Sequence, residues 1–488
     1  MSSTINFRSN AKNAVRKLTH TLRHRTGICL SLAVVALALL AAKPVWRALA
    51  AAGDLDTSFS GDGRFTPPAL FSDIGYARNF PEVRIQADPN NPQVEKVIVP
   101  YSEKLPFSCY VGSAAYDFLV TRLTASGATD STFGFNGAMA VSFAGLPGIV
   151  GGKGYVSALE LQSNGKILLA GQIETCTGYL VGLARLTFDG AMDTTFGTGG
   201  RIVLNGQAEV FDMAVSNGKI LLVGRKQEWD GNSGTPWISA IWRFNADGTP
   251  DTTFSSDGVR TLSVWPDTNT NGGPEGFKSV AVQPDGKIAV LNSTFSGSYR
   301  LRRFTSTGVF DNTLLVNAAA GEYGNTIRAG SSSIWVVGAK EQQGVKYGAV
   351  FSRNTSNGSV DTTYGGGDGV ALSAQPSEWS EMASVPLSFP SKYVVAGWNT
   401  YPFLGELDYK AVITRLSGIG VLDTGFGTNG SAETVGFSYP AGGTSPDSRY
   451  FSVRIGLSGK IVTAGQAGNF YVTAPPIEFG IVARYLGN

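Results

Sequence analysis

Apolar residues between positions 53 and 488 come in short runs that Gly, Asn, Asp and Ser interrupt. Several runs meet at an Asn-Gly-Lys or Asp-Gly-Lys turn, as in 162–171, 216–224 and 283–290. Asn-Gly and Asp-Gly between apolar runs are a strong hairpin signal, because a tight two-residue turn needs positive φ. The run after each turn is continuously apolar, which is typical of a strand covered on both faces. Because no sustained 3.6-residue apolar stripe occurs, the pattern predicts an all-β fold.

A second pattern repeats over the same region: an Asp followed three residues later by an aromatic residue, except in the degenerate fifth copy, where Leu314 takes its place. A Gly stands three residues before each Asp, and an Arg that ends a strand-like run stands eight residues before most of them. The intervals between successive Asp residues are 74, 63, 58, 60, 50 and 62. The repeated residues are Asp56, Asp130, Asp193, Asp251, Asp311, Asp361 and Asp423.

Each repeat offers four antiparallel strands: one after the Asp loop, two around the Gly-Lys hairpin and one that ends in Arg. Seven such repeats predict a seven-bladed β-propeller, and a linear solenoid with capping repeats is the alternative. The first repeat lacks its Arg strand, and the last strand, which ends at Arg484, has no Asp loop after it. These halves complement each other. We therefore expect a ring closed by the N-terminal loop and strand around Asp56 against the C-terminal strand.

The repeated Arg and Asp residues are interpreted as parts of the scaffold. An Asp at the start of a turn accepts hydrogen bonds from backbone N–H groups two or three residues on, and an Arg can pair with it at a blade junction. A functional site would occur in one or two blades rather than in all of them. The expected structural pairs are Arg122 with Asp130, Arg185 with Asp193, Arg243 with Asp251, and Arg484 with Asp56.

The charge of the chain is unevenly distributed. Among its 488 residues are 39 Lys and Arg, 37 Asp and Glu, and two His. Residues 1–52 hold eight of the basic residues, no acidic one and both histidines, which leaves 31 basic and 37 acidic residues in 53–488. The basic start, the apolar run of 16 residues at 27–42 and the small residues at 48–52 favour a secretory signal peptide. An uncleaved N-terminal membrane anchor is the alternative, although the run is short for a membrane span.

The organisation that follows is residues 1–52 as the signal or anchor and residues 53–488 as a single propeller. We expect the propeller to be secreted, periplasmic or on the cell surface. Without histidine it has no Ser-His-Asp or Cys-His triad and no His-ligated metal. Its negative formal charge disfavours nucleic-acid binding, which needs a basic footprint. No cofactor is expected, because the Asp-Gly loops at 60–63 and 367–369 have too few ligands for a dedicated calcium site.

The combined motif resembles the delta-60 repeat of bacterial proteins. The resemblance rests on Gly-x-x-Asp-x-x-Phe-Gly-x-x-Gly followed by a Gln-x-Asp-Gly-Lys-Ile type of hairpin. The copies at 127–137 and 190–200 match closely, whereas the copy at Gly308 does not. The resemblance covers essentially all of 53–488. It implies a bacterial source and a propeller-like domain on exported proteins, and it brings no catalytic residue.

The connection that precedes the Arg strand is the most variable part of the repeat and is rich in aromatic residues. Variation on a constant scaffold is where binding residues are found, and exposed Trp and Tyr beside acidic residues suit a sugar or a protein. Cys109 and Cys176 fall in this connection of adjacent blades, as a disulfide or as two free thiols. The candidate ligand-binding residues are Trp229, Asp230, Trp398, Tyr401, Phe403, Glu406, Phe470 and Tyr471.

Two functions stay open. The first is an exported, non-enzymatic propeller that binds a protein or another partner through its aromatic loops. The second is a secreted carbohydrate-binding or carbohydrate-active propeller that uses carboxylates. An enzyme should place two or three carboxylates and an aromatic residue together at the channel mouth, whereas a scaffold should show a shallow aromatic face. In both cases we expect a monomer that contacts a membrane only through an uncleaved N-terminal segment. No catalytic or metal-ligating residue is assigned.

Overall fold

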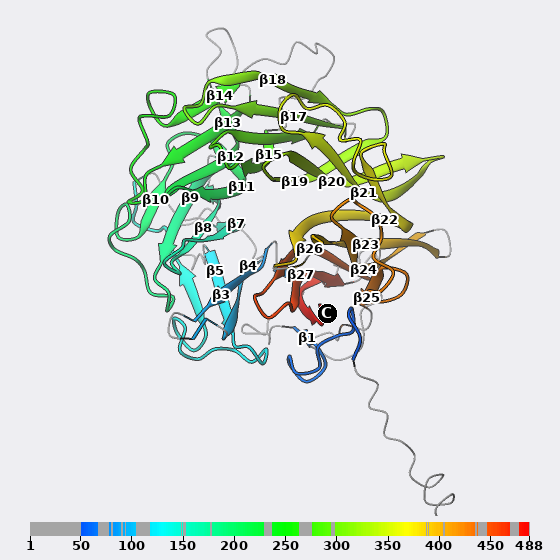
Figure 1. Ribbon diagram of the computed structural model, residues 1–488. Helices are drawn as coiled ribbons and strands as arrows, with labels where there is room; N and C mark the ends of the chain where they lie inside the picture. Colours follow the sequence, from blue (N-terminus) through cyan, green and yellow to red (C-terminus); the bar gives the residue numbers. More distant parts are fainter. Residues whose placement is uncertain are drawn as a thin grey trace, which may run out of the picture. The chain divides into compact units, whose positions relative to one another are not determined.

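The structure is a computed structural model (Figure 1). The residues that it describes are 50–66, 78–79, 82–88, 91–92, 94–103, 118–147, 149, 153–175, 178–228, 237–262, 276–293, 298–386, 388, 390–403, 406–434, 437, 447–468 and 478–487. Apart from Ala50, they belong to one compact unit, Ala51–Asn488. The leader at 1–49 and both Cys109 and Cys176 lie outside them. Within these ranges we find no helix of sufficient length and hydropathy to span a membrane.

The regular elements of the described ranges are all β-strands, as the apolar pattern predicts. Three sheets consist of four consecutive antiparallel strands. The first contains β7 (Lys153–Leu161), β8 (Ile167–Thr175), β9 (Gly178–Leu186) and β10 (Arg201–Val203). The second contains β11 (Ala208–Ser216), β12 (Lys219–Gln227), β13 (Trp237–Phe244) and β14 (Val259–Leu262). The third contains β15 (Phe277–Val282), β16 (Ile288–Ser293), β17 (Tyr299–Phe304) and β18 (Phe310–Asn317).

Three further sheets depart from this simple order. One joins β2 (Arg78–Asn79), β3 (Arg84–Ala87), β4 (Glu95–Glu103), β5 (Phe118–Leu123) and β6 (Ala138–Val141). A seven-stranded sheet runs through β19 (Glu322–Ala329), β20 (Ser333–Gln342), β21 (Val345–Asn354), β22 (Val370–Ser384), β23 (Lys392–Phe403), β24 (Glu406–Ser417) and β25 (Ser431–Thr434). The last contains β26 (Asp447–Ile455), β27 (Ile461–Gly468), β28 (Glu478–Tyr485) and β1 (Arg64–Phe65).

The seven-stranded sheet consists of two groups of four strands that share β22. The first part of β22 pairs with β21 and the second part pairs with β23. A single strand of 15 residues therefore belongs to both groups. The sequence does not predict this sharing, because nothing in the repeat marks a missing turn between the two groups.

The second strand of a group is deeply buried, as its continuous apolar run predicts, and the third strand is buried to a similar extent. In β8, each residue from Ile167 to Ala170 is fully buried. The turn before it has Gly165 at a φ of 78°, a conformation that glycine adopts without strain.

The two ends of the described chain lie in one sheet (Figure 1). β1 pairs antiparallel with β28, with Arg64 opposite Ala483 and Phe65 opposite Val482. The Asp56 N–H also donates to the Arg484 carbonyl at 2.8 Å. The N-terminal segment thus supplies the fourth strand of the last group, which places it against the C-terminal strand.

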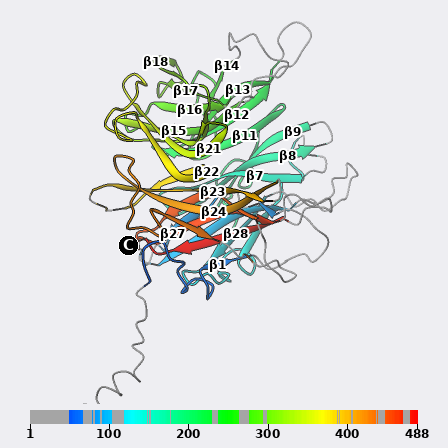
Figure 2. The same cartoon turned by 90° about the vertical axis from the view of Figure 1, so that its right-hand side faces the viewer.

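The first strands of successive groups contact one another in chain order, from β3 through β7, β11, β15, β19 and β22 to β26, and β26 also contacts β3. In Figure 1 these strands lie toward the middle of the unit, and β10, β14 and β18 lie toward its edge. Figure 2 gives a side view in which β7, β8 and β9 again lie next to one another.

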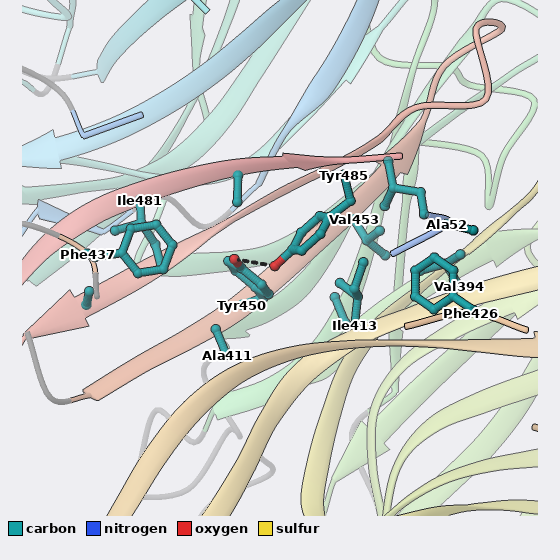
Figure 3. Packing of buried hydrophobic residues seen from close by; sticks show 14 of the residues in the cluster. Ala52, Val394, Ala411, Ile413, Phe426, Phe437, Tyr450, Val453, Ile481 and Tyr485 are labelled. Carbon is teal, nitrogen blue, oxygen red and sulfur yellow. Dashed lines mark hydrogen bonds between the residues drawn. The ribbon is translucent and has the colours of Figure 1, made fainter. Parts of the chain in front are cut away.

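Hydrophobic clusters fill the space between neighbouring groups. Figure 3 shows the cluster between the groups that contain β24 and β28. Its polar feature is a hydrogen bond of 2.7 Å between the hydroxyls of Tyr450 and Tyr485, both buried. Burial raises the pKa of Tyr450 to about 12, so this hydroxyl stays protonated. It therefore hydrogen-bonds to the Tyr485 hydroxyl without placing a charge in the cluster.

Candidate functional site

The predicted Arg and Asp residues form buried ion pairs at the end of the third strand of a group. Arg122 Nε lies 2.8 Å from Asp130 Oδ2, and the Arg122 side chain is fully buried. Asp130 Oδ1 accepts hydrogen bonds from the N–H and the hydroxyl of Thr132. The equivalent pairs are Arg185–Asp193 at 2.6 Å, Arg243–Asp251 at 2.7 Å, and Arg303–Asp311, Arg415–Asp423 and Arg484–Asp56 at 2.8 Å.

A lysine beside the hairpin turn joins each of these pairs. Lys96 Nζ lies 3.1 Å from Asp130 Oδ2, so the carboxylate lies between two cations. The lysine therefore connects the start of the second strand to the loop that follows the third. The equivalent contacts are Lys166–Asp193, Lys392–Asp423 and Lys460–Asp56 at 2.8 Å, Lys219–Asp251 at 3.1 Å and Lys287–Asp311 at 3.5 Å.

The far side of each Arg bonds to the next group of strands. Arg122 Nη1 donates to the carbonyl of Phe188, in the loop after β9, at 2.7 Å. The equivalent donors and acceptors are Arg185 to Ala246, Arg243 to Ser306, Arg303 to Thr355, Arg415 to Gly487 and Arg484 to Ala125. The repeated ion pair thus links neighbouring groups, which is a scaffold role.

The copy at Asp361 departs from the pattern, because the strand before it is shifted by one residue. In the copies with an ion pair the N–H of the Asp donates to the carbonyl of the repeat Arg, whereas Asp361 donates to Ser352 at 3.1 Å. The hydroxyls of Ser352 and Ser333 donate to Asp361 Oδ2 at 2.9 and 3.1 Å. Arg353, which stands eight residues before Asp361, instead lies 3.6 Å from Glu322. The spacing therefore does not predict the pairing at this copy.

The repeated aromatic residue packs against the repeated glycine of the next group. Phe133 is fully buried, and a Cβ at Gly190 would lie 2.7 Å from its ring. Gly190 also has a φ of 83°. The N-terminal segment repeats this contact, since a Cβ at Gly53 would lie 3.4 Å from the ring of Phe426 and 2.7 Å from the backbone of Gly427.

Two phenylalanines of one loop provide a matched test of this packing. Phe133 is fully buried, whereas Phe135 is 83% exposed. Phe133→Ala is expected to lower the free energy of unfolding by about 3–5 kcal/mol, because it leaves a cavity between two groups. Phe135→Ala should change it by less than about 0.5 kcal/mol. Guanidinium denaturation of both variants checks this, and equal effects would contradict the assigned role.

The predicted ligand-binding residues are only partly described. Trp398, Tyr401 and Phe403 lie on β23, and Glu406 starts β24. Trp229, Asp230, Phe470 and Tyr471 lie outside the described residues. β23 and β24 are each 12 residues long and pair without interruption up to Phe403 opposite Glu406.

This hairpin places Trp398 and Tyr401 on opposite faces, because successive side chains in a strand alternate. The Tyr401 hydroxyl donates to the Glu433 carboxylate, which also accepts a bond of 2.6 Å from Asn399 Nδ2. On the other face, Trp398 packs edge-on against Phe451, with ring centres 6.2 Å apart. The structure therefore does not gather these aromatic side chains into one face of the hairpin.

A cavity of about 1440 Å³ lies among the first strands. Residues of β3, β7, β11, β15, β19, β22 and β26 line it, whereas the repeated ion pairs do not. Its aromatic lining residues are Phe211, Trp335, Tyr393 and Phe451. Its acidic and basic lining residues are Glu82, Arg84, Glu160, Asp212, Lys278, Arg328, Glu381 and Arg454.

Three of the lining carboxylates hold neighbouring first strands together. Glu82 Oε2 accepts the N–H of Leu159, and Asp212 Oδ2 accepts the N–H of Val280, both at 2.9 Å. Glu381 Oε2 accepts the N–H of Val453 at 3.0 Å. Ser452 fills the same position in β26, where its hydroxyl accepts the N–H of Val83 at 3.2 Å.

The lining arginines form two clusters of opposite balance. Arg84 Nη2 lies 2.6 Å from Glu160 and 3.1 Å from Glu82, so two carboxylates share one cation. In the second cluster, Arg454 Nη1 lies 2.6 Å from Glu381 Oε1, and Arg328 Nη2 contacts the same oxygen. There two cations share one carboxylate.

Burial and this crowding perturb the titration of the lining groups. Burial, and then repulsion from Arg454, lowers the pKa of Arg328 to about 10. Burial, and then repulsion from Arg84, lowers the pKa of Arg454 to about 10. Burial also raises the pKa values of Glu82 and Asp212. Perturbed groups that face a cavity mark a candidate functional site.

The pKa values of the repeat aspartates are lowered, in contrast to those of Glu82 and Asp212. Burial alone would raise the pKa of Asp130, but hydrogen bonds from Thr132 and Lys96 and the charge of Arg122 lower it to about 2. The pKa values of the other repeat aspartates are also lowered, by the same kinds of contact.

We therefore expect the free energy of unfolding to fall steeply as the pH decreases from 5 toward 2.5. A lowered pKa stabilises the folded state above the unfolded value of about 3.9, and this gain is lost as the pH falls through the folded value. Glu82 and Asp212 act in the other direction, because their folded forms bind protons more tightly, but the lowered aspartates outnumber them. Urea midpoints at pH 7, 5, 4 and 3 measure the effect. A constant midpoint down to pH 3 would contradict it.

Sequence reasoning missed the cavity residues, although a signal exists. Glu160 and Arg454 each stand six residues before a hairpin lysine, Lys166 and Lys460. A charged residue at the same place in two repeats, in a strand expected to be covered by its neighbours, indicates a polar interior. No group of three or more His, Cys, Asp or Glu among the described residues could hold a metal ion.

Comparisons with known proteins agree with the architecture. Residues 162–196 and 216–254 match a family model described as "Domain of unknown function (DUF5122) beta-propeller". Both segments contain a Gly-Lys hairpin and end at the aromatic of an Asp-Thr-Thr-Phe motif. No curated protein matches the sequence.

Several solved structures are similar at low identity. A protein from Lactobacillus plantarum is 10% identical, with 81% of this chain and 96% of that chain covered and a TM-score of 0.42. An alpha-L-arabinanase of Penicillium chrysogenum is 12% identical, with 86% and 96% covered and a TM-score of 0.37. A protein of unknown function from Bacteroides caccae is 12% identical, with 66% and 97% covered and a TM-score of 0.31. The chain thus has the all-β, sheet-by-sheet architecture of a β-propeller, and two of its segments are similar to a β-propeller family of unknown function.

Proposed function

We propose that residues 53–488 form a closed, seven-bladed β-propeller that works outside the cytoplasm as a non-enzymatic binding scaffold. Seven blades follow if β22 is counted in both of its groups. Closure is supported by the pairing of β1 with β28, by the bond from Arg484 to the Ala125 carbonyl and by the bond from Val83 to Ser452. Export is supported by the basic and apolar character of residues 1–52.

The observation that carries a non-enzymatic role is the use of the carboxylates. Glu82, Asp212 and Glu381 each accept a backbone N–H from the neighbouring first strand. A carboxylate that accepts a hydrogen bond from the backbone in this way is poorly placed to exchange protons with a substrate. The repeat residues are likewise engaged within the scaffold. The binding surface that remains is the long β23–β24 hairpin with Trp398 and Tyr401.

A carbohydrate-active propeller is the second candidate, and one observation favours it. Glu160 lines the cavity with a side chain that is 25% exposed, and it is held ionised beside Arg84. A glycosidase of the usual kind needs a second carboxylate on the other side of the scissile bond. Glu381 lines the same cavity but is only 9% exposed.

A binding array and a hydrolysis screen on purified residues 53–488 distinguish the binding scaffold from the carbohydrate-active enzyme. We expect binding on an array of glycans and surface proteins, together with no turnover in a hydrolysis screen of polysaccharides. The double variant Trp398→Ala, Tyr401→Ala should lose the binding, whereas the exposed-aromatic control Phe135→Ala should keep it. Turnover that disappears in Glu160→Gln would favour the enzyme instead.

A further inference from the structure

We propose that the cavity among the first strands binds a sugar acid, a hydroxylated ligand in which each sugar unit carries one carboxylate. This goes beyond partner binding at the β23–β24 hairpin, because it uses residues of β3, β7, β19, β22 and β26 instead. It concerns a site that the repeat pattern does not explain.

The carboxylate of the ligand would bind beside Arg328 and Arg454. Both guanidinium groups contact the same oxygen of Glu381, so at this oxygen two cations share one carboxylate. Their side chains are 32% and 19% exposed, so both reach the surface of the cavity. A second anion at this place would relieve the repulsion between the two cations.

Arg454 has the donors for such an anion. Its Nη1 donates to the Val453 carbonyl at 2.7 Å and contacts Glu381. Its Nε and Nη2 have no hydrogen-bond partner among the described residues, and they are not enclosed within the protein. The Nε and Nη2 edge of a guanidinium is the one that binds a carboxylate through two parallel hydrogen bonds.

The hydroxyl groups would face the wall formed by β3 and β7, next to β26. Glu160, 25% exposed, accepts from Arg84 and lies in a wall where carboxylates already outnumber cations. A neutral hydroxyl can donate to such a carboxylate without adding charge. Neutral polar side chains complete this part of the lining, among them Ser157, Gln162 and Asn164. Hydroxyls and amides are the groups that bind sugar hydroxyls in either direction.

Room for a ring comes from small residues at the position that Arg84, Glu160, Arg328 and Arg454 occupy in other first strands. Ala214, Ala281 and Ala383 stand there in β11, β15 and β22 and line the cavity. The volume of about 1440 Å³ exceeds the ~300–1,000 Å³ of common small-molecule pockets. An oligomer of two or more acidic sugar units therefore fits. The rings of Phe211 and Phe451 offer apolar faces for stacking.

Calorimetric titration of the full, unmodified chain tests the carboxylate without any variant. The probes are digalacturonate, galacturonate, neutral galactose and glutamate, the last carrying a carboxylate without hydroxyls. We expect galacturonate and its dimer to bind, with an affinity at least about 10-fold above that of galactose and of glutamate. Equal affinity for the acid and the neutral sugar would overturn the proposal, and so would the absence of any binding at millimolar concentration.

Two arginine substitutions locate the site. Arg454→Gln should weaken galacturonate binding by about 10-fold or more, since a hydrogen bond to a charged group is lost. Arg64→Gln is the matched control, because Arg64 is also partly exposed and paired with one acid, Asp62, outside the cavity. It should bind as the unmodified protein does. If Arg454→Gln does not fold, the comparison of acid and neutral sugar on the unmodified chain decides alone. Unchanged affinity in a folded Arg454→Gln contradicts the site.

Discussion

A chain that begins at residue 67 is expected to lose the cooperative unfolding transition that a chain beginning at residue 50 shows. The segment 50–66 contains β1, the buried Phe59 and Asp56. Removal of a buried Phe side chain costs about 3–5 kcal/mol, and a buried Arg484 without Asp56 costs a similar amount. The sum of about 6 kcal/mol or more is comparable with the ~5–15 kcal/mol that stabilise a typical domain.

A third protein separates the contribution of the β1 strand to stability from that of the Asp56–Arg484 ion pair. In the chain 50–488, Asp56→Asn keeps β1 and Phe59 but leaves Arg484 and Lys460 facing an amide. We expect this variant to keep a cooperative unfolding transition, with a denaturation midpoint below that of the unmodified chain 50–488. Guanidinium titrations followed by fluorescence measure all three. Identical midpoints for 50–488 and 67–488 would show that the N-terminal segment does not contribute to closure.

Asp130→Asn is expected to lower the free energy of unfolding by about 3–5 kcal/mol. The Asp130 carboxylate lies between Arg122, whose side chain is fully buried, and Lys96. An amide in its place removes the negative charge and can also turn an N–H group toward these two donors. Arg122 and Lys96 then keep only the more distant carboxylates of Asp189 and Asp88, each at 3.8 Å. The fully buried guanidinium loses its close anion, which is the costly outcome for an ion pair of this kind.

Asp361→Asn is the matched control, because it changes the same atom at the same place of another repeat. Its acceptors bond to the hydroxyls of Ser333, Ser352 and Thr363, which can reverse the direction of a hydrogen bond. We expect a loss of about 1 kcal/mol or less. Equal losses for Asp130→Asn and Asp361→Asn would mean that the cations contribute nothing to the repeat.

Much of the scaffold could be predicted from the sequence, because the repeat depends on residues that are close together in the chain. A turn such as the one at Gly165 needs positive φ, and an Asp that caps a turn selects the Thr or Ser two residues on. These requirements recur in most groups, so strands, hairpins and most ion pairs follow from spacing alone. The missing Arg strand in the first repeat likewise predicts the position of β1 beside β28.

Other features depend on contacts that no local pattern encodes. A one-residue shift of the strand register puts Ser352 at the position that the repeat Arg takes in other groups. The sequence of a strand does not reveal such a shift, because the register depends on the partner strand. β22 serves two groups because the turn between them is absent. The cavity charges lie in first strands whose sequences vary, and only the contact of β26 with β3 brings Glu82 and Arg454 to the same cavity.

The loops that the sequence singles out for binding contribute least to the described structure. Trp398 and Tyr401 are close in sequence, yet their side chains lie on opposite faces of the β23–β24 hairpin, because side chains alternate along a strand. The polar cavity, which composition does not suggest, contains the groups with perturbed pKa values. For this chain, residues that vary between repeats at a buried position are therefore the better guide to a candidate site.

The central claim is that the N-terminal strand closes the ring, and a cross-link tests it most directly. Arg64 and Ala483 are opposite each other in β1 and β28, and Cα atoms paired in this way lie about 4.5–5.5 Å apart, within disulfide range. In a chain with its native cysteines replaced by serine, Arg64→Cys with Ala483→Cys should form a disulfide spontaneously, detected by mass spectrometry of the linked peptides. The control Arg64→Cys with Val482→Cys, whose side chains point to opposite faces, should not. Absence of the first cross-link, or equal yields of both, would contradict the closed ring.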